Sequence, residues 1–597
     1  MKKLLRICSL LFALCIILCA CGGDTAPGAT TTGTSTITTI PTTTPTADKL
    51  DLYRELPRLR DKFVTAEPSE GDLILAQDGE AMATIVYAAG SDKARSAAAD
   101  LQNFLQQITG ASFAMIHDGE AIPEGNLILV GFTTKTVELG VGPYTGYPDA
   151  EKISVIRKEN ILILCGNDDN RYTGTQQAVT YFLEEAGCGW YADDPLWQIV
   201  PDCPTLAVKA VEETFEPTIA GRDISNIPSS IRSRWYLGGD DFSAGHGLWR
   251  WGGESKYADH PEWFALVNGS RDPKLVDWWQ YCYTNEEFAE VVANGVISYL
   301  DTHPDMVSYS IASNDGWYEG WCECDTCAAV GNQSDQMLLF ANRVAEIVCA
   351  KYPEKRISFL AYHPTFLPPV NTTEAHPNVE VRFCLETNPM DDLMADRQVH
   401  DGYNWINQLE YTQSWLDNVT EWIEKANLQN VSIWGWFCID DPMYKWQYAP
   451  WIQGNVASRN IDVFESLGVE TIFIDGSYRE ETYFLRWPLN YAFAKCMYFG
   501  DLTGEEVLYD ACQKLYGEAA DEMFLYYRIL ADSAQESLGS GGINWVPPGL
   551  LEVYGDNYND IQMAVLAVQA KLDLLTEEQA QRVQTQLYGW TYVELYI

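Results

Sequence analysis

The chain has 597 residues, and its 84 acidic and 39 basic residues give a formal net charge of −45. This charge argues against a nucleic-acid partner, which needs a basic surface, and the length allows several domains with their own cores. The 20 tryptophans and 33 tyrosines indicate carbohydrate stacking, although aromatic cores would use the same residues.

The N-terminus has the pattern of a processing signal. Basic residues precede an apolar run over 7–20, which is too short for a membrane-spanning helix. Residues 18–21, Leu-Cys-Ala-Cys, resemble a bacterial lipobox, which implies a signal peptide over 1–20 and lipidation of Cys21; a plain signal peptide is the alternative. Residues 21–48 are a Thr/Pro-rich linker. We therefore expect an extracytoplasmic lipoprotein that contacts the cell membrane only through its lipid anchor.

A small α/β domain is predicted over residues 72–212. Short apolar runs indicate strands, and an apolar face repeating at helical spacing indicates an amphipathic helix that ends at Gly110. The predicted strands are 83–87, 126–130, 153–157 and 161–165, and the predicted helices are 93–108 and 176–185.

Three stretches of this domain carry a resemblance. KARSAAADLQNFLQQITG, NLILVG and LILCGNDDNRYTGTQQAVTYFLEEAGCGWY resemble the N-terminal domain shared by family-20 hexosaminidases and α-glucuronidases. The resemblance implies a non-catalytic domain that accompanies a catalytic barrel.

Residues 217–500 alternate strands with helices, which predicts a (β/α)8 TIM barrel. An open doubly wound sheet is the alternative, and the pattern does not identify an eighth strand. Residues 501–597 are predicted to be helical and to pack against the barrel. The predicted barrel strands are 219–224, 278–283, 306–311, 357–362, 379–385, 431–437 and 471–474, and the helices between them include 286–300, 334–351, 413–426 and 459–467.

Polar and aromatic residues follow the predicted barrel strands, where the chemistry of such barrels collects. Glu386 directly follows a strand and is not a favoured turn or cap residue. For Asn314 with Asp315, and for Asp475, a turn or a helix cap is the alternative interpretation. The candidate site residues are Glu386, Asp315, Asn314, Trp317, Tyr362, His246, Trp436 and Asp475, with Asp440 and Asp441 as further acids.

Three cysteines, Cys322, Cys324 and Cys327, lie within six residues. They could hold a metal such as zinc if a fourth ligand came from elsewhere. A disulfide to a distant cysteine, or reduced packing, are the alternatives. Single cysteines in apolar strands, such as Cys165, Cys384 and Cys438, are expected to be small buried hydrophobic residues.

A second resemblance covers about residues 260–527. The stretches HPEWFALVNGSRD, SIASNDGWYEGWCECDTC, SDQMLLFANRVAEIVCAKYPEKRISFLAYHPTFLPP, VEVRFCLET and LYDACQKLYGEAADEMFLYY resemble glycoside hydrolase family 163, whose members are endo-β-N-acetylglucosaminidases acting on complex N-glycans. Two motifs depart from that family. Its Trp-Asp-Tyr is here Trp434-Gly435-Trp436, which loses a carboxylate, and its Glu-Gln-Gly is here Ile474-Asp475-Gly476.

The second resemblance implies roles for the matching residues. Glu386 would be the general acid/base, and Asp315 with Asn314 would orient the acetamide of the substrate so that it acts as nucleophile. If Asp315 attacks directly, the two carboxyl groups should lie about 5 Å apart. Trp317, Tyr318 and Trp321 would stack on sugar rings.

These features predict a glycoside hydrolase that cleaves β-linked N-acetylglucosamine in complex glycans without a cofactor. One alternative is an exo-glycosidase of glucuronidase type, for which Arg222 and Arg382 would bind the substrate carboxylate. The other is a glycan-binding surface lipoprotein without catalysis.

Overall fold

The computed structural model describes residues 55–276, 278–316, 320–371, 374–385, 403–404, 409–410, 415–436, 448–450, 454–475, 483–538 and 550–597. The signal peptide and the whole linker with Cys21 lie outside these ranges, as do Trp317, Tyr318, Glu386, Cys438 and the acids at 440 and 441. What the sequence predicts for them stays a prediction.

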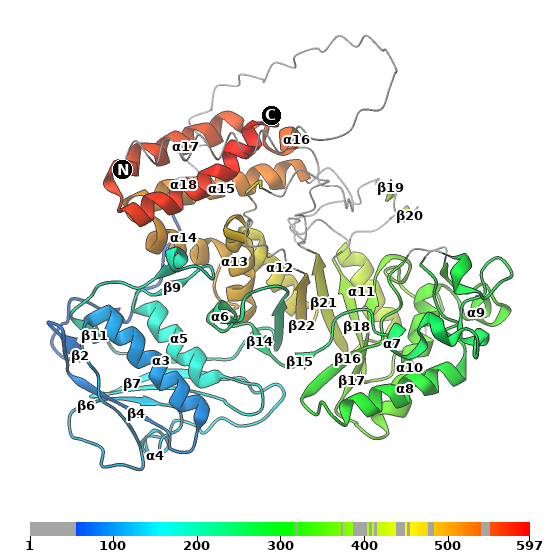
Figure 1. Cartoon of the computed structure of the whole chain (residues 1–597), viewed down its shortest axis with the longest axis horizontal. Coiled ribbons are helices and arrows are strands. Elements are labelled where there is room, and N and C mark those ends of the chain that lie inside the picture. The colour runs from blue at the N-terminus through cyan, green and yellow to red at the C-terminus, as the bar shows by residue number, and fades with distance from the viewer. Residues whose placement is uncertain are drawn as a thin grey trace, which may run out of the picture. The chain divides into compact units, whose positions relative to one another are not determined.

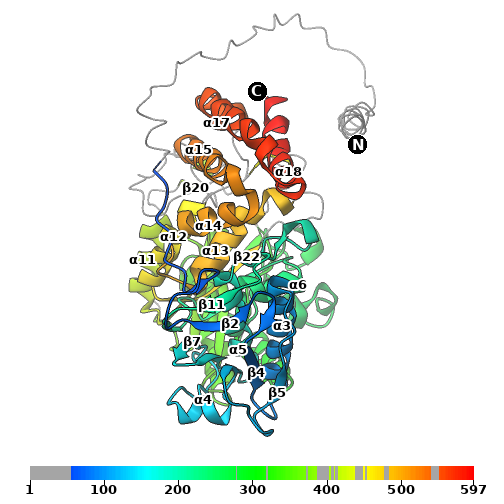
Figure 2. The same cartoon turned by 90° about the vertical axis from the view of Figure 1, so that its left-hand side faces the viewer.

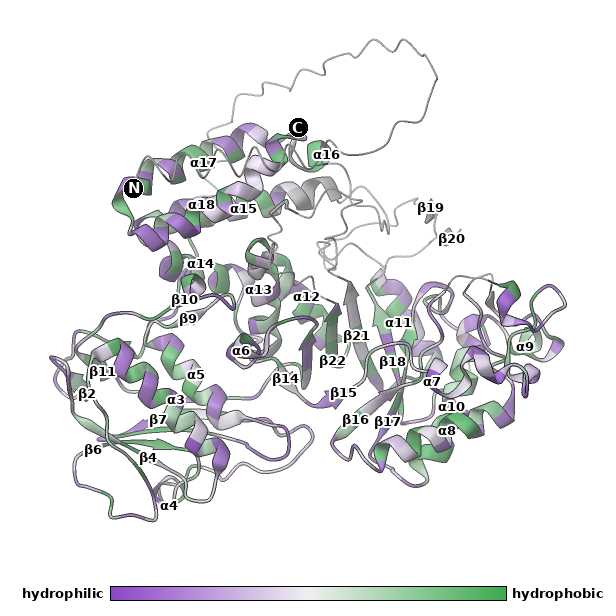
Figure 3. Cartoon of the chain, in the orientation of Figure 1, coloured by the Kyte–Doolittle hydropathy of each residue, from purple (hydrophilic) through white to green (hydrophobic). Residues whose placement is uncertain are grey.

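An α/β region comes first in the described chain (Figure 1). Strands β4 (Ala83–Tyr87), β6 (Asn126–Val130), β7 (Ile153–Lys158) and β8 (Ile161–Gly166) confirm the predicted strands, and α3 (Asp92–Thr109) and α5 (Gly174–Glu185) the predicted helices. Hydrophobic and hydrophilic residues both occur along α3, as an amphipathic helix requires (Figure 3). The Ser91 side chain caps its first turn, and Gly110 ends it at a φ of 73°.

The barrel sheet has eight strands within the described residues, in the order β14-β13-β22-β21-β18-β17-β16-β15. Neighbouring strands from β13 to β15 along this order are parallel, and only β14 pairs antiparallel, with β13. The predicted barrel fold is therefore confirmed, and the open doubly wound sheet, which was the alternative, is not what the chain forms. The bounds are β13 (Gly221–Ile224), β14 (Gly238–Gly239), β15 (Asp241–Phe242), β16 (Met306–Ser310), β17 (Arg356–Ala361), β18 (Val379–Cys384), β21 (Asn430–Trp436) and β22 (Val469–Asp475).

The helices between these strands also follow the prediction closely. They are α8 (Glu286–Leu300), α10 (Gln333–Cys349), α11 (Trp415–Ala426) and α12 (Gly454–Ser466), followed by α13 (Trp487–Tyr498). Helices α10 and α12 contact β17 and β22, respectively. Their buried faces are apolar, which explains why helical periodicity revealed them.

One predicted barrel strand is wrong. Residues 278–283 lie in the long segment 243–285 between β15 and α8, which we call the excursion. Within it, Tyr281 makes a single antiparallel bridge with Phe264. The aromatic run that indicated a buried strand instead packs against other aromatic rings, with Tyr281 4.6 Å from Phe288 between ring centroids. The second strand of the barrel is β15, which has two residues and is too short to show an alternating pattern.

Residues 238–242, which we call the seam segment, bring the two edges of the sheet together, so that the barrel is nearly closed. Strand β14 pairs at one edge of the sheet and β15 at the other, and only Asp240 separates them. The hydroxyl of Tyr172, from the α/β region, donates to the buried Asp240 carboxylate, and the backbone N–H of Asp241 donates to the Tyr147 hydroxyl at 2.9 Å. Burial raises the pKa of Asp240 to about 6.

The C-terminal part is helical, as predicted. Helices α14 (Gly504–Tyr516), α15 (Ala520–Leu538), α17 (Tyr558–Lys571) and α18 (Glu577–Glu594) lie together (Figure 2). Within the predicted helical region 501–597, a 3₁₀ turn at Leu572–Leu574 separates α17 from α18. None of the helices that the structure describes is long and apolar enough to cross a bilayer.

Candidate active site

The carboxyl ends of the parallel strands share one rim of the barrel. Asn314 and Asp315 follow β16, Tyr362 follows β17, and Asp475 ends β22. Just below, Ala312, Leu360 and Cys384 form a small apolar cluster against which Tyr362 and Trp434 pack. The rim therefore gathers residues that lie far apart in the sequence.

His246 and Asp315 are neighbours on this rim. The loop that carries His246 runs beside β16, because His246 bridges Ala312 and Gly247 approaches so closely that a Cβ there would lie 2.1 Å from the Ser310 carbonyl oxygen. His246 Nδ1 lies 2.6 Å from the Ser313 carbonyl oxygen, and Nε2 lies 3.9 Å from Asp315 Oδ1.

This geometry fixes the tautomer of His246. A carbonyl oxygen can only accept, so Nδ1 carries a proton and Nε2 faces the carboxylate. The side chains of His246 and Asp315 are 29% and 55% exposed. A ligand from solution can therefore reach both groups.

Asn314 anchors the loop that carries Asp315. Its side-chain amide donates to the Trp279 carbonyl oxygen at 3.0 Å, and its backbone carbonyl accepts from Gln280 Nε2 at 2.7 Å. Asn314 therefore positions its neighbour Asp315, and no described contact tests its predicted role toward substrate.

Tyr362 stands beside a buried histidine. Its ring centroid lies 6.1 Å from that of His246 and 3.6 Å from that of His363. Burial, with His246 nearby, lowers the pKa of His363 to about 3, so this ring is neutral near pH 7. His363 has a φ of 51°, in the left-handed region that a non-glycine residue rarely adopts.

Asp475 lies on the same rim, across the ring closure. Ser225, which directly follows β13, donates its hydroxyl to Asp475 Oδ1 at 2.8 Å. The backbone of Trp436 pairs with Asp475, while the Trp436 side chain lies outside the described atoms. Ser225 is absent from the predicted site because a lone serine after a strand carries no sequence signal.

Two exposed tryptophans flank the pair of His246 and Asp315. Trp249 is 57% exposed, and its indole N–H donates to the His246 carbonyl oxygen at 3.1 Å. Trp278 is 52% exposed and lies against Gly316, where a Cβ would be 2.6 Å from the Trp278 Cβ. The sequence prediction missed both as site residues, since Trp278 was placed in a barrel strand.

Trp321 is not available as a sugar-stacking platform. Its side chain is buried, and its ring centroid lies 4.9 Å from that of Tyr283. The predicted stacking role is wrong because Trp321 belongs to the aromatic core beneath the excursion.

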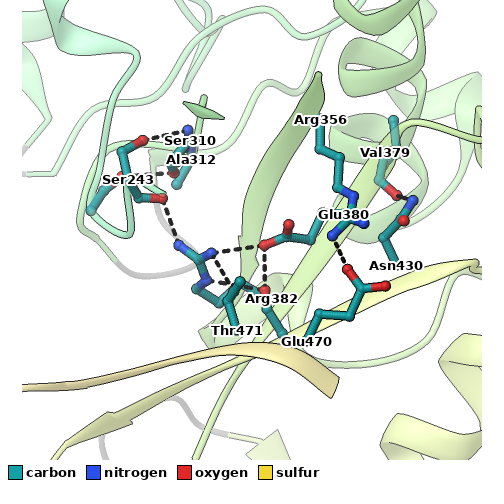
Figure 4. Close-up of polar contacts among 12 residues, drawn as sticks. Ser243, Ser310, Ala312, Arg356, Val379, Glu380, Arg382, Asn430, Glu470 and Thr471 are labelled. Carbon is teal, nitrogen blue, oxygen red and sulfur yellow. Dashed lines mark hydrogen bonds and ion pairs between the residues drawn. The ribbon is translucent and has the colours of Figure 1, made fainter. Parts of the chain in front are cut away.

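The two arginines that were candidates for binding a substrate carboxylate both form buried ion pairs within the protein. Arg382 lies in β18 and is fully buried, where it donates to Glu380 at 2.7 Å, to the Ser432 hydroxyl at 3.0 Å and to the Ser243 carbonyl at 2.6 Å (Figure 4). Arg222 is equally buried and pairs with Glu151 at 2.7 Å. Neither guanidinium can reach a ligand on the rim.

The structure adds a fourth cysteine to the cluster that the sequence indicated. Cys282, from the excursion before α8, joins Cys322, Cys324 and Cys327, and the four thiols lie within 4.8 Å of one another. Cys165 and Cys384 are buried, as expected. The sequence interpretation missed Cys282 because 40 residues of chain separate it from the other three.

Comparison with known proteins gives one family and several distant structures. The family described as "Domain of unknown function (DUF4838)" matches residues 195–528. No curated protein matches the chain.

Among solved structures, an N-acetyl-beta-hexosaminidase of Streptomyces plicatus is 12% identical at a TM-score of 0.40, over 80% of this chain and 96% of that one. A GH20 beta-N-acetylhexosaminidase of Streptomyces coelicolor A3(2) gives the same identity and TM-score, over 79% and 96%. Endo-glycoceramidase II of Rhodococcus sp. is 12% identical at a TM-score of 0.23, over 34% and 46%. At these scores none of these structures indicates what this chain binds.

Proposed function

The chain belongs to the DUF4838 family, and we propose that it is a glycoside hydrolase acting on glycans that contain β-linked N-acetylglucosamine. One observation carries this proposal: an exposed carboxylate, Asp315, stands at the carboxyl end of a barrel strand beside His246 and two exposed tryptophans. An acid beside aromatic platforms on this rim suits a saccharide. The resemblance of residues 260–527 to glycoside hydrolase family 163 supports the same substrate class.

The strand order supports a second acid in the same site. Glu386 directly follows Leu385, whose backbone N–H donates to Trp434 O at 2.9 Å on the rim. Strands β16 and β18 flank β17, and neighbouring strands lie about 4.8 Å apart, so their ends are separated by roughly 10 Å. Side chains that lean toward each other over this span would reach the carboxyl separations of about 5 to 9.5 Å that glycosidases use.

The proposed mechanism assigns proton transfer to Glu386 and orientation of the substrate to Asp315. Glu386 protonates the leaving glycosidic oxygen, and later takes a proton from the attacking water. Asp315 holds and polarises the substrate acetamide, whose carbonyl oxygen attacks the anomeric carbon as that bond breaks. His246, with Nε2 toward Asp315, orients this carboxylate, and Trp249 and Trp278 stack on sugar rings.

The test is a digest of complex N-glycans and glycoproteins, read by mass spectrometry. We expect the chain to release an oligosaccharide, the Glu386→Gln variant to be inactive while folded, and the folded Asp315→Asn variant to lose most of its turnover. Asp305→Asn is the matched control, because Asp305 precedes β16 at the opposite end of the same strand. Full activity in Asp315→Asn or Glu386→Gln would remove that residue from its role.

A second candidate function is glycan binding without turnover, since the sequence lacks the acid of the Trp-Asp-Tyr motif. Its expected outcome in the same digest is a bound but intact glycan. A released monosaccharide would instead indicate an exo-glycosidase, although the commitment of Arg222 and Arg382 to buried pairs argues against a uronic acid substrate.

We also propose that the enzyme is a lipid-anchored surface protein, on the basis of residues 18–21 alone. A Cys21→Ser variant, expressed with its own leader in a bacterial host, should lose labelling by radioactive palmitate. Absence of labelling in the unaltered protein would indicate a plain signal peptide, and labelling that persists in the variant would place the lipid at another residue.

A further inference from the structure

Four cysteines converge between the excursion that precedes α8 and the loop that follows β16. Cys282 Sγ lies 3.8 Å from Cys324 Sγ and 3.7 Å from Cys327 Sγ. All four sulfurs, with that of Cys322, lie within 4.8 Å of one another. The other free cysteines of the described ranges are distributed through several different elements.

The sulfur spacing is that of a metal tetrahedron. A Zn–S bond is about 2.3 Å, so the edge of a ZnS₄ tetrahedron is about 3.8 Å, whereas a disulfide brings two sulfurs to about 2.05 Å. We propose that Cys282, Cys322, Cys324 and Cys327 bind one zinc ion in a tetrahedral four-cysteine site. Four protein ligands leave no position for a substrate or water, so the ion is structural.

Hydrogen-bond donors surround the four sulfurs, as thiolate ligands require. The Leu266 backbone N–H donates to Cys322 Sγ at 3.2 Å, and the Cys327 N–H donates to Cys324 Sγ at 3.5 Å across a Cys-x-x-Cys turn. The Thr284 hydroxyl lies 3.2 Å from Cys327 Sγ. Such second contacts orient the ligands of a metal and tune their charge.

The charge of the site is also partly balanced. Each thiol loses its proton on binding, so four protons leave as one Zn²⁺ enters and the centre keeps two negative charges. The Arg271 guanidinium interacts with Cys282, Cys322 and Cys324. An apolar wall that includes Ala265 and Val267 closes the cluster off.

The ion would fasten two segments that otherwise share few regular backbone bonds. The loop after β16 packs closely on the excursion, since a Cβ at Gly320 would lie 2.2 Å from the Trp278 carbonyl oxygen. Asn314 is bonded to Trp279 and Gln280 in the same contact. Zinc would thereby hold the loop that carries Asp315, but the metal site itself does not depend on the proposed function.

Metal analysis of the purified full chain tests the proposal. We expect about one zinc per chain in the unaltered protein, and its loss in Cys282→Ser and in Cys324→Ser. Cys349→Ser is the matched control, because Cys349 is a half-buried free thiol in α10, away from the cluster. Absence of stoichiometric metal, zinc retained in Cys282→Ser, or disulfides among these four cysteines by non-reducing peptide mapping would each overturn the site.

A measurement on the unaltered protein covers the case in which the serine variants do not fold. Titration with an organomercurial should release the zinc as four thiols react. The zinc-free protein reloaded with Co²⁺ should show thiolate-to-cobalt charge-transfer bands and the strong visible bands of tetrahedral cobalt. Cobalt spectra of an octahedral oxygen site, or release of zinc without reaction of thiols, would contradict the four-cysteine assignment.

Discussion

Two pairs of polar side chains in the barrel have opposite surroundings. Arg382 and Glu380 lie inside the sheet, each about 1% exposed, and hydrogen bonds from three strands and one loop satisfy the guanidinium. His246 and Asp315 lie on the rim at 3.9 Å, open to solvent. A buried charge held by an oppositely charged neighbour serves the fold, whereas an exposed carboxylate held at a strand end is available to a ligand.

Breaking the buried pair should give the largest effect. Arg382→Leu leaves the Glu380 carboxylate buried without its partner, which should cost about 3–5 kcal/mol in the free energy of unfolding. Urea unfolding followed by fluorescence measures it. Arg95→Ala, which removes an exposed pair with Asp92, should change stability by less than about 1 kcal/mol. A cost no larger for Arg382→Leu than for this control would contradict a structural role.

Neutralising the rim carboxylate should affect catalysis and spare stability. Asp315→Asn should lower kcat by about 10²–10³-fold, the loss typical when a group that stabilises the transition state is removed. Its unfolding curve should overlay that of the unaltered protein because Asp315 is exposed. Comparable losses of stability and activity would place Asp315 with the buried pair instead.

The neutral His363 beneath Tyr362 should make stability depend on pH. Its pKa in the folded chain is about 3, below the unfolded value of 6.5, so the unfolded chain binds more protons between these values. This histidine therefore does not lower the free energy of unfolding above about pH 6.5. Below that pH the free energy of unfolding falls toward pH 3 by up to about 1.4 kcal/mol per pH unit. His363→Gln should flatten the curve over this window, and His303→Gln, at an exposed site, should not. An unchanged slope in His363→Gln would show that other groups set it.

The exposed tryptophans should give the smallest effect. Trp249→Ala and Trp278→Ala should each raise KM by up to about tenfold, because an aromatic contact is worth about 0.5–1.5 kcal/mol. Leu275→Ala, which removes a more exposed apolar side chain (70%) from the same excursion, is the control. An unchanged KM in both tryptophan variants would show that Trp249 and Trp278 do not stack on the sugar.

Local patterns predicted the regular elements well. Apolar periodicity located α3, α8 and α10 and most strands of the barrel, since burial of one face dictates the spacing. It failed at β15, whose two residues show no period, and over 278–283, where an aromatic run packs within an excursion. Periodicity reports burial but does not report which sheet, or whether any sheet, a segment joins.

The candidate site was predictable only in part, for reasons of distance along the chain. Asp315, Tyr362 and Asp475 could be placed on the rim because each follows a strand. The contact of His246 with Asp315, and the arrival of Cys282 at the cysteine cluster, depend on how two long loops fold over one strand. Arg382 also shows the limit, since its place in a strand does not reveal that its charge is matched inside the barrel.

The seam segment links the α/β region to the barrel through side-chain hydrogen bonds. Tyr147 and Tyr172 hydrogen-bond to the stretch that joins the two edges of the sheet within the described residues. A barrel made without residues 72–212 would keep its strands but lose this fastening. We therefore expect the barrel to be more stable when it is expressed together with the α/β region.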